Sequence, residues 1–147
     1  MQARSECYEM TVQRNLSFLL EYIFRNLKSL AGARTSRIQI TAQIRMQKML
    51  SYICDHYAEA ITLSDIAGAA NISRSEAGRC FAAYMGCSPI ETVIRYRLQA
   101  ARRLLNETEL TLQQICFACG FNSVNYFSRQ FGKSYGIAPG KFRMLGK

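Results

Sequence analysis

Two arginines, Arg79 and Arg129, hold matching places in two similar stretches of the chain, at an offset of 50. At helical spacing each shares a face with short side chains, namely Ser75, Gly78 and Ala82 for the first and Asn125, Ser128 and Gly132 for the second. Guanidinium groups donate paired hydrogen bonds to phosphates and to guanine edges, and a short-sided helix fits a groove about 12 Å wide. The alternative is that each face is merely solvated and has no function. The same arrangement occurs in both stretches, however, which favours a binding role.

These two faces belong to a unit that occurs twice, at residues 62–89 and 111–139. The first halves of the two copies match at an offset of 49 and the second halves at 50, so the second copy has one extra residue in its central turn. Turns accept insertions, whereas packed helices do not. The pattern therefore predicts a repeated helix-turn-helix, with helices over 63–70 and 74–84 in the first copy and a second helix over 123–134 in the second.

Capping residues agree with these helix starts and ends. A hydroxyl followed three residues later by an acid or amide predicts a capping box at four places: Thr62 with Asp65, Ser73 with Glu76, Ser88 with Glu91, and Thr111 with Gln114. Residues that tolerate left-handed backbone stand at the predicted ends and turns: Gly86, Gly136, Asn71 and Gly120.

A helix predicted over 89–105 joins the two copies. Its apolar stripe is long enough to touch both and consists of Ile90, Val93, Ile94, Leu98, Ala101, Leu104 and Leu105. Seventeen residues of helix span about 26 Å, at 1.5 Å per residue. With the flanking turns, this is of the order needed to hold two helices about 34 Å apart, which is one turn of duplex DNA.

Two further helices are predicted upstream of the repeat. Residues 8–31 carry an apolar stripe that a lone helix cannot bury, so this helix must dock on the rest of the chain or on another copy. We favour self-association, because the segment lies outside the repeat. Residues 33–37 are small and polar and indicate a linker. A helix over 41–57 should pack as the first helix of the first copy, through Ile44, Met49, Leu50, Ile53 and Tyr57.

The formal net charge of +9 indicates a polyanionic partner, which by charge alone could be a nucleic acid, a membrane surface or a ribosome. No acid follows Glu109, and the basic residues fall in two groups that we expect to contact phosphates: Arg95, Arg97, Arg102 and Arg103, then Arg129, Lys133, Lys141, Arg143 and Lys147. No apolar run could cross a bilayer and no secretory signal is evident, which predicts a soluble, cytoplasmic, nucleoid-associated protein without a membrane partner.

Most of the six cysteines are predicted to be small core residues of a reduced protein. Cys116 and Cys119 form a C-x-x-C, but neither a second pair nor a nearby His accompanies it, so we expect no metal and no cofactor. No paired acid and base indicates catalysis, and the chain is predicted not to be an enzyme.

The spaced motif of residues 42–145 resembles the DNA-binding domain of AraC/XylS-type transcription regulators. It comprises Ile66-Ala67, Ser73, Arg79-Cys80-Phe81, Gly86-Cys87-Ser88-Pro89, Arg97-Leu98, Ala100-Ala101, Leu104-Leu105, Ile115, Gly120-Phe121, Tyr126-Phe127, Arg129, Phe131, Gly136, Pro139 and Phe142-Arg143. The resemblance implies an all-α fold, with two helix-turn-helix subdomains joined by a linker helix and an N-terminal amphipathic helix before them. It implies double-stranded promoter or operator DNA as partner, and RNA polymerase as a further candidate.

The same resemblance places two sets of side chains against DNA: Arg74, Ser75, Gly78 and Arg79 in the first copy, and Ser123, Val124, Asn125, Tyr126 and Arg129 in the second, with Lys133 beside them. By their chemistry, Arg79 and Arg129 suit guanine or phosphate, Asn125 suits adenine, and the two serines suit phosphate. The motif often has Ala at Cys116, Ser at Asn125 and Lys at Gly132, so the chain departs from it there. Gly78 and Ser75 offer few base-specific groups, which predicts weaker readout by the first copy.

The expected domain map runs 1–35 for the N-terminal helical segment, 41–88 for the first subdomain, 89–106 for the linker helix and 107–147 for the second subdomain. Family members typically also carry an effector-binding domain, which this sequence has no room for, so we expect a fragment or a short homologue. Two other functions compete: a cysteine-based DNA-repair protein on the same fold, and a helical interaction module. Neither the operator, the target genes nor the direction of regulation follows from the sequence.

Overall fold

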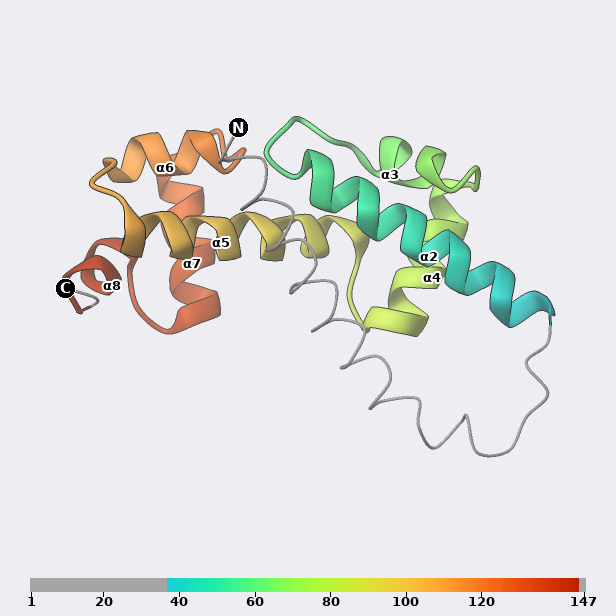
Figure 1. The fold of residues 1–147 in the computed structure, drawn as a ribbon. Helices are drawn as coiled ribbons and strands as arrows, with labels where there is room; N and C mark the ends of the chain where they lie inside the picture. The colour runs from blue at the N-terminus through green and yellow to red at the C-terminus, as the bar shows by residue number, and fades with distance from the viewer. Residues whose placement is uncertain (1–36, 146–147) are drawn as a thin grey trace. The chain divides into compact units, whose positions relative to one another are not determined.

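Figure 1 shows the computed structural model of the chain, which describes residues 37–145. Over this range the chain forms helices and no strand, as expected for an all-α protein. The helices are α2 (Arg37–His56), α3 (Leu63–Ala69), α4 (Arg74–Met85), α5 (Pro89–Glu107), α6 (Leu112–Ala118), α7 (Val124–Tyr135) and α8 (Pro139–Leu145). The helix expected over 8–31 and most of the linker expected over 33–37 lie outside the described residues.

The chain divides into two compact units, residues 1–44 and 45–147. The described part of the first unit is the start of α2, where Ile40 and Ile44 are both about half exposed. Ile44 was expected on the buried face, and that expectation is wrong: α2 begins at Arg37, before its buried stretch starts at Met46. The buried face of α2 consists of Met46, Met49, Ile53 and Cys54.

Both copies of the repeat lie in the second unit, and the predicted one-residue difference falls in the turn. The turn of the first copy runs over residues 70–73 and that of the second over 119–123. Asn71 (φ 54°) and Gly120 (φ 82°) both adopt left-handed backbone there. In each turn the next amide donates back into the first helix, Ile72 N to Ala67 O (3.1 Å) and Phe121 N to Cys116 O (3.0 Å). The two copies therefore close their turns with the same hydrogen bond.

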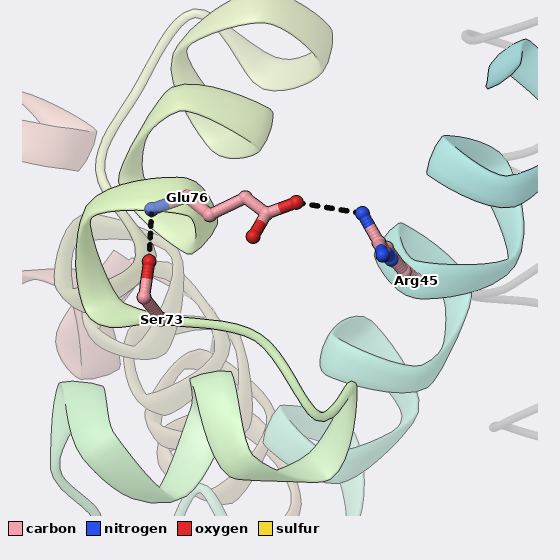
Figure 2. A network of polar contacts seen from close by, with 3 residues as sticks. All are labelled: Arg45, Ser73 and Glu76. Atoms are coloured by element: carbon pink, nitrogen blue, oxygen red, sulfur yellow. Dashed lines mark hydrogen bonds and ion pairs between the residues drawn. The ribbon is translucent and has the colours of Figure 1, made fainter.

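Three of the four predicted capping boxes form completely: Thr62 with Asp65, Ser88 with Glu91, and Thr111 with Gln114. The fourth is half formed. Ser73 accepts the amide of Glu76, as expected, but the Glu76 side chain turns away and binds Arg45 on α2 at 2.6 Å (Figure 2). This ion pair attaches α2 to the first turn of α4.

Helix α5 lies between the two helix pairs, packs against α3 and α4 of the first copy, and contacts α6 and α8 of the second (Figure 1). Because it has neighbours on several sides, it buries more than the single predicted stripe. Thr92, Tyr96 and Ala100 are also buried, whereas Ile90, expected inward, is 41% exposed. Thr92 tolerates burial because its hydroxyl donates to the carbonyl of Ser88 (3.1 Å).

The core of the second copy is a continuous cluster contributed by α5, α6, the turn and α7. Its buried members are Leu98, Ala100, Ala101, Leu105, Ile115, Cys116, Cys119, Phe121, Phe127 and Phe131. Phe142, on the unpredicted helix α8, packs against this cluster. None of the helices in residues 37–145 combines the length and the apolar character needed to cross a bilayer.

Candidate nucleic-acid interface

Helix α4 presents the first predicted set of side chains to solvent. Arg74, Ser75 and Arg79 are exposed, and a Cβ added at Gly78 would meet nothing within 4 Å. The opposite face is fully buried through Ala77 and Phe81, each 0% exposed. The packing of α4 therefore fixes the orientation of the arginine face without using any of its residues.

Helix α7 repeats this arrangement in the second copy. Asn125, Arg129 and Lys133 are exposed, while Phe127 and Phe131 are 0% exposed in the core. In Figure 1, α4 and α7 both extend to the lower side of α5, and α3 and α6 lie on its upper side. The second helix of each copy thus offers a surface that the rest of residues 37–145 leaves uncovered.

Arg129 is held over the ring of Tyr126, with the guanidinium carbon 5.5 Å from the ring centroid. Tyr126 is in turn anchored, because its ring lies 6.2 Å from that of the buried Phe121. A cation above an aromatic face loses little of its hydrogen-bonding capacity, since its N–H groups point outward in the plane of the guanidinium. Tyr126 therefore acts as a platform that orients Arg129.

The remaining two residues of the second set are partly occupied by the fold. The Ser123 hydroxyl caps α7 by accepting the amide of Tyr126 (3.3 Å), and the Val124 side chain packs against the core cluster. Ser123 retains its hydroxyl proton as a donor, so a phosphate contact stays compatible with capping. Val124 can offer only apolar contact at the edge of the face.

The first turn of α4 carries an acid, Glu76, close to the candidate surface. Its carboxylate is paired with Arg45, and the two side chains are 36% and 38% exposed (Figure 2). The pair places a positive charge from α2 beside the N-terminus of α4. Sequence reasoning missed Arg45, because nothing in the local spacing shows which distant residue a helical glutamate will bind.

Known proteins share this fold. A family model described as a helix-turn-helix domain matches residues 66–144, more than half of the chain. An AraC-type regulator from Chromobacterium violaceum has a similar structure, with a TM-score of 0.68 and 30% identity, over 71% of this chain and 94% of that one. The chain belongs to the AraC-type family of helix-turn-helix transcription regulators.

Curated relatives show how much of such a protein the chain represents. YdeC of Bacillus subtilis, an uncharacterized HTH-type transcriptional regulator, is 30% identical over 145 residues, which is 99% of this chain and 49% of the relative. GbdR of Pseudomonas aeruginosa is 32% identical over 67% of this chain and 27% of its own length. The chain therefore spans about half or less of the length of these curated relatives.

The DNA-binding domain of AdpA, solved with a target DNA, shares the fold at a TM-score of 0.65 and 24% identity, over 69% of this chain and 91% of that one.

Two of the arginines expected to contact phosphate instead hold this AraC-type fold together. Arg97 donates to the carbonyls of Tyr57 and Glu59, and Arg143 Nη2 donates to Leu110 O at 2.6 Å. The expectation is wrong for both, because their guanidinium groups are partly buried and bound to backbone oxygens. Of the other basic residues expected to contact phosphate, Arg95, Arg102 and Lys141 are exposed, and Lys147 lies outside the described residues.

The cysteines of the C-x-x-C lie in the core, as predicted. Cys116 (0% exposed) occupies the place that Ala67 holds in the first copy, and Cys119 (1% exposed) the place of Ala70. Burial raises the pKa of Cys116, and it raises that of Cys119 from 9.0 to about 11. Thiols of this kind stay protonated at neutral pH, which disfavours cysteine-based repair chemistry at these two residues. Among residues 37–145 no group of three or more His, Cys, Asp or Glu side chains could hold a metal ion.

Proposed function

We propose that the chain is the DNA-binding part of a transcription regulator that places α4 and α7 in two successive major-groove segments of one duplex. The observation that carries this proposal is the pair of equivalent helices, each with an exposed arginine face opposite a fully buried apolar face. Helix α5 joins them with 19 residues, about 28 Å of helix. This length is of the order of one duplex turn, about 34 Å.

The exposed side chains divide into base contacts and phosphate contacts by their chemistry. Arg79 and Arg129 suit the two acceptors of a guanine, and Asn125 suits adenine. Arg74, Lys133 and the two serines, Ser75 and Ser123, suit phosphate oxygens. Because α4 offers Gly78 and Ser75 where α7 offers Ser128 and Asn125, we expect α7 to contribute more of the sequence preference.

Selection of bound sites from random duplex DNA, followed by fluorescence anisotropy on the selected duplex, tests this function. Arg79→Ala and Arg129→Ala should each weaken binding about 10- to 100-fold and relax the preference at a different position of the site. Affinity should fall steeply with salt, because each neutralised phosphate releases counterions. Equal binding of selected and scrambled duplexes, unaffected by either substitution, would reject specific recognition.

The domain map and the partners of the N-terminal segment are proposals of the same kind. We place the first subdomain at 41–88, the linker helix at 89–106 and the second subdomain at 107–147, with residues 1–35 as a dimerisation segment.

The apolar stripe of residues 8–31 supports self-association through this segment. In light scattering, the full chain should have the mass of a dimer and the variant with Leu16→Glu and Ile23→Glu that of a monomer. A monomeric wild-type chain would remove the dimer from this proposal.

Localisation at the nucleoid and contact with RNA polymerase are proposed from family membership together with the net charge of +9. A polymerase contact would need a surface that DNA leaves open. Co-sedimentation of the chain with purified RNA polymerase, with and without the selected duplex, tests it. Sedimentation of the chain with DNA alone would limit the partner to DNA.

A further inference from the structure

Arg97 differs from its neighbours on α5 in what its guanidinium contacts. Nε donates to the carbonyl of Tyr57 at 2.7 Å, and Nη2 donates to the carbonyl of Glu59 at 2.8 Å. Both carbonyls belong to the segment that links α2 to α3, about 40 residues away in the chain. Burial of the guanidinium lowers the pKa of Arg97, so the cation is partly removed from water and held by these oxygens.

The same guanidinium also lies against the second copy of the repeat. Its central carbon is 5.7 Å from the centroid of the Phe121 ring, which is buried in the turn between α6 and α7. Arg97 thus joins three parts of the protein: the linker helix, the 57–59 segment of the first copy and the turn of the second copy. A planar cation with several donors can make all of these contacts at once, which an ammonium cannot.

The backbones of the two copies approach each other directly beside Arg97. A Cβ built on Gly120 would lie 2.6 Å from Ala58 O and 2.9 Å from Ala58 Cα. No side chain fits there, so the turn of the second copy lies against the 57–59 segment with no space between them. Tyr57 continues the contact, because it packs against the core cluster of the second copy.

We infer that Arg97, with Gly120 against Ala58, locks the two helix-turn-helix copies to each other and so determines the spacing of DNA segments that one chain accepts. This inference rests on the proposed function. A stiff link makes the second binding event intramolecular at a defined distance, and a loose link lowers the effective concentration of the second helix at its segment. Arg97 is a positioning residue: it acts on α4 and α7 without touching DNA.

The test compares the wild-type chain with Arg97→Met and Arg97→Lys on three duplexes. One carries both selected segments, one has 1 base pair inserted between them, and one has the first segment scrambled. Wild-type protein should bind the first duplex at least about tenfold more tightly than the duplex with the inserted base pair, since one extra base pair both rotates and shifts the second groove segment. The affinity for the first duplex divided by that for the duplex with the insertion is called the spacing ratio. Arg97→Met should reduce this ratio to about two or less, and affinity for the scrambled duplex should change less than twofold.

Arg95→Met is the matched control, because it removes the same charge from an exposed position of the same helix. Because Arg95 is among the residues expected to contact phosphate, its substitution should lower the affinity for all three duplexes by a similar factor and leave the spacing ratio at the wild-type value. Arg97→Lys keeps the charge but loses the two-pronged contact, so its ratio should fall between those of wild type and Arg97→Met. Circular dichroism melting of each variant shows whether it is folded. If Arg97→Met does not fold, the spacing ratio of Arg97→Lys tests the positioning role in its place.

The outcomes separate this inference from the proposed function. Wild-type protein that shows no preference for the selected duplex contradicts the function itself, whatever the variants do. Wild-type protein that binds specifically while a folded Arg97 variant keeps the full spacing ratio contradicts the positioning role alone. A uniform loss of affinity for all three duplexes also contradicts it, because that pattern indicates damage to the DNA-contacting surface.

Discussion

The arginines of this chain have two different roles, binding a partner and stabilising the fold, and the surroundings of each side chain show which role it has. Arg79 and Arg129 project from helices whose other face is buried, whereas Arg97 and Arg143 donate to backbone carbonyls of distant segments. A charged donor bound to a backbone carbonyl stabilises the fold, while an exposed guanidinium contributes little to stability until it binds a partner. Substitution of Arg97 or Arg143 should therefore lower stability, whereas substitution of Arg79 or Arg129 should weaken DNA binding.

Arg143→Met should lower the free energy of unfolding by about 1–2 kcal/mol, because the Leu110 carbonyl loses its charged donor. Lys141→Met is the matched control: it removes the same charge two residues away at an exposed position and should change stability by less than about 0.5 kcal/mol. Urea unfolding of both variants and the wild type measures this. Equal loss in the two variants would show that charge, and not the contact, matters.

Cys119 should make stability depend on pH in the alkaline range. Burial raises its pKa in the folded protein to about 11, against 9.0 when exposed. Below pH 9 the thiol is protonated in both states, so it adds no pH dependence. Above pH 9 the unfolded chain releases the proton first, and stability is lost as pH rises through about 11.

Cys119→Ala tests this origin, since Ala70 fills the equivalent place in the first copy. Guanidinium unfolding at pH 8 and pH 10.5 should show a larger loss of stability in the wild type than in Cys119→Ala. Parallel losses in the two proteins would assign the pH dependence to other groups.

At the scale of the element, two turns of the second copy carry different constraints, the one between α6 and α7 and the one that follows α7. Gly120 and Gly136 both have positive φ, 82° and 76°, so alanine is strained at either. Only at Gly120 would the added Cβ also collide with backbone, that of Ala58; at Gly136 it would meet nothing within 4 Å. The difference between the two substitutions therefore isolates the contact between the copies.

Gly136→Ala should cost about 1 kcal/mol of unfolding free energy, the strain of left-handed backbone alone. Gly120→Ala should cost at least about 2 kcal/mol, because the 57–59 segment must also move away. Thermal or urea unfolding of the two variants measures the difference. Equal costs would mean that the 57–59 segment yields freely and does not hold the second copy.

The helices were predictable from sequence because their signals are local. Thr62, Ser88 and Thr111 begin their helices with the predicted boxes, and Gly86 and Gly136 end theirs in the predicted left-handed conformation. The contacts between elements were not predictable. Glu76 has the spacing of a capping box but binds Arg45, and Arg97 sits among exposed arginines but turns inward. Which of two satisfactory partners a side chain takes depends on tertiary packing, which spacing along the chain does not encode.

The apolar stripe predicted on α5 also shows that spacing along the chain does not determine tertiary contacts. A period of 3.6 predicted one buried face, but the helix has neighbours on several sides, so Tyr96 and Thr92 are buried and Ile90 is exposed. Most of the candidate DNA-facing side chains are exposed, but Ser123, Val124 and Tyr126 are partly buried. Their repetition in two copies predicted which faces stay open, since the buried aromatic residues Phe81, Phe127 and Phe131 fix the opposite faces.

At the scale of the whole molecule, the repeat gives a single chain two equivalent surfaces. A helix-turn-helix protein commonly reaches two successive major-groove segments by forming a dimer. Here the covalent link through α5 and the contact of Arg97 with the 57–59 segment would do this within one chain. Self-association through residues 8–31 would then join two such pairs and double the length of DNA that is contacted.

Hydroxyl-radical footprinting on the selected duplex tests this central claim most directly. The wild-type chain should protect two patches about 10 base pairs apart on one face of the DNA. Arg79→Ala should weaken protection of one patch and Arg129→Ala that of the other. A single protected patch that both substitutions weaken alike would contradict recognition by two helices of one chain.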